Sequence, residues 1–179
     1  IYIGGEFIGI VKAPKILQLS ISLSVGVMVA LEMDVSSYIK NINSLEKTHH
    51  RQTVLKGSMG QTIIDNSFNS NPVSYIASLE ELQSYNNEGK KYLISPGMIE
   101  LGAEQFSYNY EFAHIASEVI DEALIVGLTN KGPLMLAFED NNIPVKYFKN
   151  RDLAVSYLNS VVNDNDVVLF ENDLPDHHP

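Results

Sequence analysis

From residue 53 onward, short apolar runs rich in β-branched residues alternate with longer segments in which apolar residues recur at helical spacing. The short runs predict strands over 53–56, 61–64, 91–94, 123–126, 145–148 and 166–170. The longer segments predict one helix that starts at Pro72 and further helices over 106–120, 131–141 and 153–162. Strands that alternate with helices need crossover connections, and these produce a mainly parallel sheet covered on both faces.

The alternation therefore predicts an α/β domain, a Rossmann-like three-layer α/β/α sandwich. Only residues 57–60, Gly-Ser-Met-Gly, separate the first two predicted strands. This glycine-rich turn predicts an antiparallel opening hairpin within the mainly parallel sheet. Hydrophobic residues make up 45% of the 179 positions, which is enough to fill the core of such a domain.

The first 50 residues lack this alternation. Residues 1–11 predict a hairpin that turns at Gly4-Gly5. The apolar stretch 16–33 approaches the length of a membrane span, but its serines, with Gln18 and Glu32, favour a buried helix and no membrane insertion. A short helix follows from Ser36-Ser37, where a serine can cap its start, to residue 42.

A polar, aperiodic segment over 46–52 is typical of a linker. It predicts two domains, 1–50 and 51–179, with the boundary near Arg51. The chain opens with isoleucine rather than methionine, which indicates that the first domain is a fragment.

Composition and missing motifs exclude several functions. A formal net charge of −10 argues against binding to nucleic acid through its phosphates. The absence of cysteine excludes disulfides, thiolate zinc sites and a cysteine nucleophile, and it fits a cytoplasmic location. The sequence has no dinucleotide fingerprint, no phosphate loop of the G-x-x-x-x-G-K-[ST] type, no serine nucleophile elbow and no H-E-x-x-H zinc helix.

The most informative motif follows the strand predicted over 61–64. Asp65 and three asparagines come directly after this β-branched run, and Pro72 then opens a helix. Open α/β sheets bind ligands at the carboxyl ends of their strands, so a carboxylate and several amides are expected at a ligand site. The alternative for the aspartate is a residue that caps its own turn.

The stretch from Asp65 to Pro72 resembles the aspartate-to-asparagine-proline motif in the C-terminal domain of the Mur ligase family, and most of all its D-alanyl-D-alanine-adding branch. Residues 96–102, Pro-Gly-Met-Ile-Glu-Leu-Gly, resemble a loop of that branch that ends in Met-x-Glu-Leu-Gly. Arg51 lies where the family has its hinge arginine, and the helix over 16–35 resembles the end of the central ATPase domain. Together these similarities cover nearly the whole chain.

The resemblance implies an ATP-dependent amide ligase of peptidoglycan precursor synthesis. Such an enzyme uses ATP and Mg²⁺ to activate a carboxylate of a UDP-linked muramoyl peptide, which the amine of an amino acid or dipeptide then attacks. The central domain supplies the phosphate loop, and the C-terminal domain closes over the site and excludes water. This chain resembles that closing domain, and without a phosphate loop we expect it to be inactive alone. The alternative is a non-catalytic binding or scaffolding module with the same fold.

The resemblance also implies roles for individual residues. Asp65 would accept hydrogen bonds from the ATP ribose, Asn69 and Asn71 would contact the nucleotide, and Arg51 would reach its phosphates. Phe68 would stack on the base or belong to the core. The substrate side would involve Glu100, Asn172 and Asp173, although Glu100 could simply begin the next helix. No metal site is expected, because the adjacent pairs His49-His50 and His177-His178 rarely converge on one ion.

Two regions depart from the family pattern. After the last predicted strand the family has a Lys-Gly-Ser type turn, where this chain has Glu171-Asn172-Asp173. An acidic edge there would favour an ammonium group over a carboxylate. In the first domain, Gln18 and Ser22 stand where the family has adenine-contacting residues, which bears on whether the parent enzyme is active.

Overall fold

The computed structural model describes residues 1–11, 18–42, 53–68, 70–85 and 88–172. The chain divides into two compact units, Ile1–Lys47 and Thr48–Pro179.

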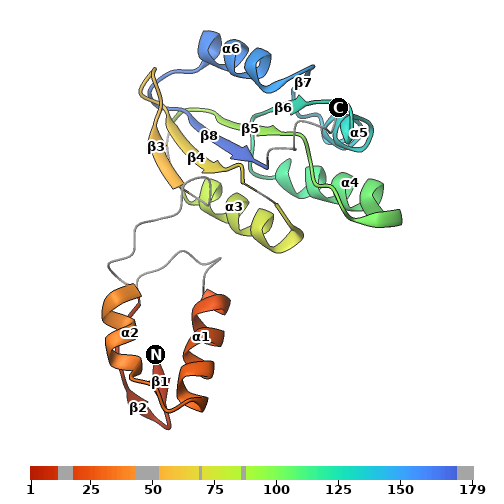
Figure 1. The fold of residues 1–179 in the computed structure, drawn as a ribbon. Coiled ribbons are helices and arrows are strands. Elements are labelled where there is room, and N and C mark those ends of the chain that lie inside the picture. The colour runs from red at the N-terminus through yellow and green to blue at the C-terminus, as the bar shows by residue number, and fades with distance from the viewer. Residues whose placement is uncertain (12–17, 43–52, 69, 86–87, 173–179) are drawn as a thin grey trace. The chain divides into compact units, whose positions relative to one another are not determined.

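The second unit is built on a six-stranded sheet with the order β3-β4-β8-β5-β6-β7 (Figure 1). The strands are β3 (Thr53–Lys56), β4 (Thr62–Asn66), β5 (Lys91–Ser95), β6 (Glu122–Val126), β7 (Val145–Phe148) and β8 (Val167–Glu171). β3 pairs with β4 antiparallel, whereas every other pair is parallel. The sheet is therefore mainly parallel with an antiparallel opening hairpin, which confirms the predicted fold.

Helices cover both faces of this sheet. The helices α3 (Pro72–Ser84), α4 (Gln105–Ala116) and α5 (Lys131–Asp140) share one hydrophobic cluster with the sheet, while α6 (Arg151–Val161) packs on the opposite face. Side chains alternate between the two faces along a strand. In β5, Leu93 therefore enters the first hydrophobic cluster and Ile94 enters the cluster on the opposite face. Figure 1 shows α6 alone on its side of the sheet, so the three layers are complete.

The first unit is small and mostly helical. A hairpin of β1 (Tyr2–Ile3) and β2 (Glu6–Phe7) precedes α1 (Gln18–Ala30) and α2 (Val35–Ile42). The predicted serine cap of the second helix is wrong. Asp34 takes that role, since its Oδ1 accepts hydrogen bonds from the backbone N–H groups of Ser36 at 3.0 Å and Ser37 at 3.2 Å.

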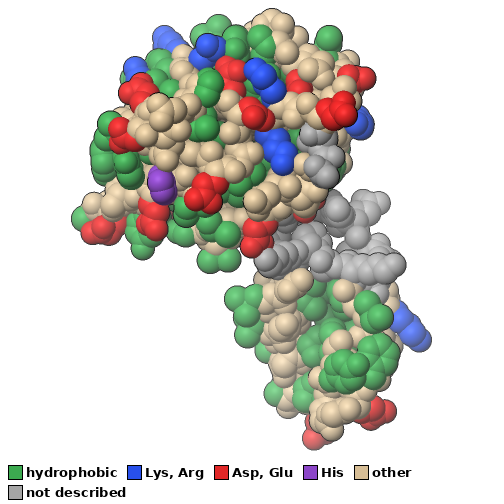
Figure 2. Space-filling model, turned by 180° about the vertical axis from the view of Figure 1, so that it is seen from behind, with side chains coloured by type: hydrophobic (Ala, Val, Ile, Leu, Met, Phe, Trp, Pro, Cys, Tyr) green, Lys and Arg blue, Asp and Glu red, His purple; other side chains and the backbone are tan. Residues whose placement is uncertain are grey.

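Helix α1 has apolar residues on all sides, interrupted by Gln18 and three serines, and much of its surface is uncovered within this unit. Leu19 is 70% exposed and Leu23 is 62% exposed, whereas only Ile21 and Val25 are buried. Figure 2 shows that charged side chains are sparse on the described surface of this unit and frequent on the other. A helix with apolar residues all round is usually buried in a larger domain. Among the described helices, none has the length and apolarity needed to cross a membrane.

Candidate functional site

The carboxyl ends of three neighbouring strands place several predicted residues at one edge of the sheet. Asn66 at the end of β4 lies beside Glu171 at the end of β8, and Phe170 lies beside Ile94 of β5. The described residues that follow these strands, including Ser67 after β4, Pro96 after β5 and Asn172 after β8, therefore leave the sheet along the same edge. We call this the carboxyl edge; it is the edge at which parallel sheets of this type bind ligands.

Asp65 lies at this edge and is almost buried, with 8% of its surface exposed. Its Oδ1 accepts hydrogen bonds from the backbone N–H of Ser67 at 3.1 Å and from the Ser67 hydroxyl at 2.6 Å. This is the local turn that aspartate favours, so the neighbouring serine orients the carboxylate. The neighbouring Phe68 is 58% exposed and does not belong to the core.

Asn71 is the N-cap of α3. Its Oδ1 accepts hydrogen bonds from the backbone N–H groups of Val73 and Ser74, both at 3.0 Å, and the Ser74 hydroxyl accepts from the Asn71 N–H at 2.9 Å. With Pro72 at the first helical position, this capping box fixes where the helix begins. The amide oxygen is thus used by the helix, and the amide N–H₂ group takes no part in the cap.

Three of the predicted site residues, Arg51, Asn69 and Asp173, fall outside the described residues, as do the histidine pairs 49–50 and 177–178. Among the residues that the structure does describe, no group of three or more side chains is arranged to hold a metal ion.

The loop after β5 is held by two buried asparagines. Asn109 is 0% exposed; its Oδ1 accepts from the Met98 N–H at 2.8 Å and its Nδ2 donates to the Met98 carbonyl at 2.9 Å. Asn130 is 1% exposed, and its Nδ2 donates to the carbonyls of Pro96 and Met98, both at 3.0 Å. Because buried amides make these bonds, the loop that resembles the family motif has a defined conformation.

Gly97 lets this loop approach the asparagines. Its φ is +78°, and a Cβ at this position would lie 2.5 Å from Asn109 Oδ1 and 2.9 Å from Asn130 Cβ. Asn172 adds a further hydrogen bond to this loop, since its Nδ2 donates to the Gly97 carbonyl at 2.6 Å. Glu100, farther along the loop, is exposed and adopts a positive φ of 64°, which is uncommon for a residue other than glycine.

Glu171 is the least expected residue of the site, because a carboxylate predicted to make the edge acidic is fully buried. It accepts hydrogen bonds from Asn66 Nδ2, at 3.1 Å and 3.0 Å to its two oxygens, and a very short one from the Ser70 hydroxyl. Burial raises the pKa of Glu171 to about 7, although these hydrogen bonds favour the charged form. Its carboxylate therefore points inward and titrates near neutral pH.

Sequence reasoning included Asn66 among the asparagines of the motif but missed its pairing with Glu171, and it missed Asn109 and Asn130 as parts of the site. Asn109 did carry a signal, because it is a polar residue on the face of α4 that also buries Phe112, Ala113 and Ala116. A buried polar side chain needs a partner, so its place on that face pointed to a hydrogen-bond network. The pairing of Asn66 with Glu171 carried no such signal, since 105 positions separate the two residues.

Comparison with known sequences connects the second unit of this chain to a protein family. The profile of the family described as "Mur ligase, glutamate ligase domain" matches residues 50–171. The UDP-N-acetylmuramoyl-tripeptide–D-alanyl-D-alanine ligase of Bacillus subtilis (strain 168) is 30% identical over 89 residues, which cover 49% of this chain and 20% of that ligase.

Comparison with solved structures agrees on the fold. The MurF ligase from Thermotoga maritima in complex with ADP matches 87% of this chain with a TM-score of 0.64 and 24% identity. A crystal structure of MurF from Acinetobacter baumannii matches 89% with a TM-score of 0.72 and 17% identity. The matches cover 34% and 35% of those two chains, so this chain spans about a third of their length.

A first prediction concerns the Gly97 loop. We expect Gly97→Ala to lower the free energy of unfolding of the second unit by about 3 kcal/mol, because the new methyl group adds a clash with Asn109 to the strain of a positive φ. Gly102→Ala is the matched control, since Gly102 also has a positive φ, +58°, but open space around it. Urea denaturation of both variants tests this, and an equal loss in the two would contradict the steric argument.

A second prediction concerns the pH dependence of stability. The pKa of Glu171 is raised from 4.5 to about 7 in the folded protein, so the folded state holds the proton more tightly than the unfolded chain. The resulting stabilisation is full below about pH 4.5 and is lost as the pH rises through about 7. This loss amounts to about 3 kcal/mol.

We therefore expect Glu171→Gln to gain stability relative to the unmodified protein as the pH rises from about 5.5 to about 8.5. Urea denaturation across this range measures the difference. Glu139→Gln, at an exposed position of α5, is the control and should leave the pH profile unchanged. A difference between Glu171→Gln and the unmodified protein that is the same at every pH would show that Glu171 does not titrate in this range.

Proposed function

The chain belongs to the Mur ligase family through its glutamate ligase domain at residues 50–171, and from this membership we propose that it is the C-terminal part of an ATP-dependent ligase. The parent enzyme joins a carboxylate of a UDP-linked muramoyl peptide to the amine of an amino acid or a dipeptide. A D-alanyl-D-alanine dipeptide is the preferred candidate, because the Bacillus subtilis relative is named for that addition. A cytoplasmic location, where ATP is available, fits this activity.

The observation that carries the proposal is the ordered carboxyl edge. Asp65, the capped start of α3 and the loop around Gly97 all meet there. The first two positions hold a carboxylate and a helix N-terminus, which are the groups that suit the hydroxyls and phosphates of a nucleotide. That one related MurF structure contains ADP supports a nucleotide as the ligand.

We assign the nucleotide side to four residues. Asp65 accepts hydrogen bonds from the ribose hydroxyls, with Ser67 holding the carboxylate in position. Asn71 offers its amide N–H₂ group, because the helix already uses its oxygen. Asn69 is proposed as a further amide contact and Arg51 as a phosphate contact, both by resemblance to the family motif.

We assign the substrate side to Glu100, Asn172 and Asp173. Glu100 is exposed on the loop after β5, where its charge can reach an incoming amine. Asn172 acts indirectly, since its amide donates to the Gly97 carbonyl and so positions that loop. Glu171 takes no direct part, because its carboxylate is buried and hydrogen-bonded inside the domain.

When bound, ATP supplies the phosphoryl group that activates the substrate carboxylate. In this proposal the present chain binds the ribose, orients the loop beside the amine and helps to exclude water from the activated carboxylate. Mg²⁺ and most contacts to the triphosphate, apart from that of Arg51, are assigned to the rest of the central domain, in line with the family resemblance.

We assign residues 1–50 to the end of that central ATPase domain and 51–179 to the lid. The structural matches cover 87% and 89% of the chain, more than the segment matched by the family profile. The exposed apolar surface of α1, including Leu19 and Leu23, is also what a helix taken from a larger domain would present.

A second candidate is a non-catalytic binding or scaffolding module of the same fold. It is favoured by Glu171, which stands where the family has a Lys-Gly-Ser type turn, and by Ser22, whose hydroxyl donates to the Gln18 carbonyl at 2.8 Å within α1. A phosphate loop upstream in the parent chain supports the ligase, whereas its absence supports the module.

We expect the isolated chain to show no ATP hydrolysis and no ligation, because it has no phosphate loop. A phosphate-release assay with ATP and Mg²⁺, with and without the D-alanyl-D-alanine dipeptide and UDP-muramoyl tripeptide, tests this. Measurable turnover by the pure chain would overturn the assignment of the phosphate loop to the missing part of the parent.

We also expect ADP to bind weakly, with a Kd above about 0.1 mM, since only part of the nucleotide site is present. Backbone amide NMR shifts during an ADP titration should move at 65–71, and Asp65→Ala should abolish the effect. Asp65→Asn keeps an oxygen that the Ser67 turn can use, so it separates lost charge from lost folding. Asp164→Ala, at an exposed turn, is the control. Tight binding that Asp65→Ala leaves unchanged would contradict the site.

A further inference from the structure

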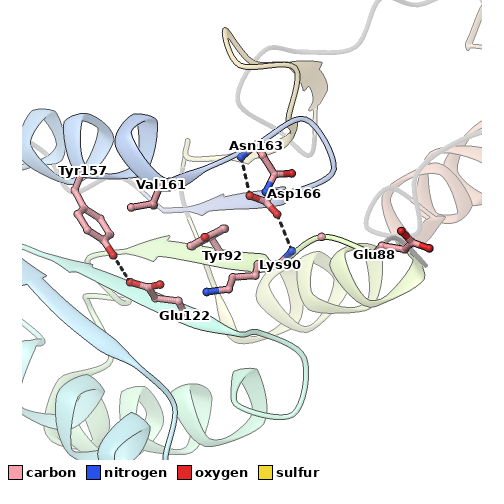
Figure 3. A pocket seen from close by; sticks show the side chains of 9 residues that line it. Glu88, Lys90, Tyr92, Glu122, Tyr157, Val161, Asn163 and Asp166 are labelled. Atoms are coloured by element: carbon pink, nitrogen blue, oxygen red, sulfur yellow. Dashed lines mark hydrogen bonds between the residues drawn. The ribbon is translucent and has the colours of Figure 1, made fainter.

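A polar pocket lies at the opposite edge of the sheet from the carboxyl edge, where the parallel strands begin. It has a volume of about 280 Å³ and takes its walls from the starts of β5 and β6, the turn before β8 and the last part of α6. Figure 3 shows its main side chains, which are Lys90, Tyr92, Glu122, Tyr157 and Asp166. None of these residues belongs to the carboxyl edge described above.

Tyr92 places a hydroxyl group without a hydrogen-bond partner in this pocket. The residue is only 2% exposed, and its ring packs in the hydrophobic cluster beneath α6. Among the described residues, no donor or acceptor pairs with its hydroxyl. Burial, with the nearby carboxylates of Asp166 and Glu122, raises the pKa of Tyr92 to about 12. A neutral buried hydroxyl that lacks a partner costs free energy unless a ligand or water supplies one.

Glu122 is a second buried polar group in this pocket whose hydrogen bonds are only partly made. It is 7% exposed, and one carboxylate oxygen accepts a hydrogen bond from the Tyr157 hydroxyl at 2.7 Å. Within the described part of the chain, the other oxygen has no hydrogen bond and the carboxylate has no ion pair. Buried carboxylates are normally paired with a cation, so this one is set up to accept a positive group.

The remaining charges also favour a cation. Asp166 is 1% exposed, and its two oxygens accept from the backbone N–H groups of Lys90 at 2.7 Å and Asn163 at 2.8 Å. It is therefore a structural residue whose negative charge still acts on the pocket. The pocket thus holds the carboxylates of Glu122 and Asp166 against the one ammonium of Lys90, whereas Figure 3 shows the exposed Glu88 carboxylate directed away from them. A pocket lined with an excess of one charge attracts ligands of the opposite sign.

We propose that this pocket binds a small molecule carrying a primary ammonium group, with Glu122 as its counter-ion and the Tyr92 hydroxyl as a second hydrogen-bond acceptor. A volume of about 280 Å³ is at the small end for ligand pockets, so it suits a short aminoalkyl chain. The site is separate from the proposed ligase function, because it uses the other edge of the sheet.

The test is a titration of the full chain with n-butylammonium chloride at constant ionic strength, followed by backbone amide NMR. Butan-1-ol serves as the neutral probe of the same shape and butyrate as the anionic one. We expect saturable shifts at Tyr92, Glu122 and Tyr157 with the ammonium probe, and at least about tenfold weaker binding for the other two.

Variants connect the binding to the named groups. Glu122→Gln keeps an oxygen for the Tyr157 hydroxyl but removes the charge, and we expect it to weaken the ammonium probe by at least about tenfold. Tyr92→Phe should weaken binding of the ammonium probe several-fold. Lys90→Met removes the competing positive charge and should strengthen binding of the same probe. Glu111→Gln, on the exposed surface of α4, is the control and should change nothing.

Three results would overturn the proposal: no saturable shift with n-butylammonium, equal binding of butan-1-ol, or ammonium binding that survives Glu122→Gln. Binding of butyrate that Lys90→Met abolishes would also overturn it, by showing that the pocket takes anions. Circular dichroism of each variant establishes that the fold is intact. None of these outcomes affects the ADP titration, which reports on the opposite edge of the sheet.

Discussion

The placement of the last strand in the middle of the sheet is the constraint on which the second unit depends. β8 pairs with β4 on one side and with β5 on the other, so residues 167–171 join two parts of the chain that otherwise share no strand pairing. Every residue of β8 is buried. Because these pairings span long stretches of sequence, their loop-closure cost is offset only when the whole sheet forms. The carboxyl edge therefore exists only in the complete fold.

Buried polar groups then turn that edge into a defined surface. Asn66 and Ser70 hold Glu171, while Asn109 and Asn130 hold the loop around Gly97. Each of these groups costs free energy to bury, and each recovers it through hydrogen bonds made inside the domain. Loops fixed in this way are held in one conformation by hydrogen bonds within the domain. The edge can thus present Asp65 and the start of α3 in a position that binding does not have to create.

Local sequence patterns predicted the strands and helices of this molecule, but they did not predict the pairings between residues far apart in the sequence. The strands, the helices and the three-layer fold follow from apolar periodicity, which each segment carries within its own sequence. The start of α3 at Pro72 was predicted for the same reason, although the cap that Asn71 makes there was not. The inward turn of Glu171 depends on which strands neighbour β8, and the strand order is not written in any local pattern. The wrong cap before α2 shows a smaller limit, because Asp34 and the serines after it are all good capping residues.

The two edges of one parallel sheet face opposite electrostatic conditions, and this explains why they hold different groups. At the carboxyl edge the helices begin, and the N-terminus of α3 is partly positive. That end suits an anion such as a nucleotide phosphate. Of the carboxylates at this edge, Glu171 is buried with a pKa raised to about 7, and Asp65 accepts hydrogen bonds from Ser67. At the amino edge the helices end, and the partly negative C-terminus of α6 lies beside the pocket of Glu122 and Tyr92. A cation there is favoured by the helix as well as by the carboxylates, so the polarity of the fold separates two binding preferences within one domain.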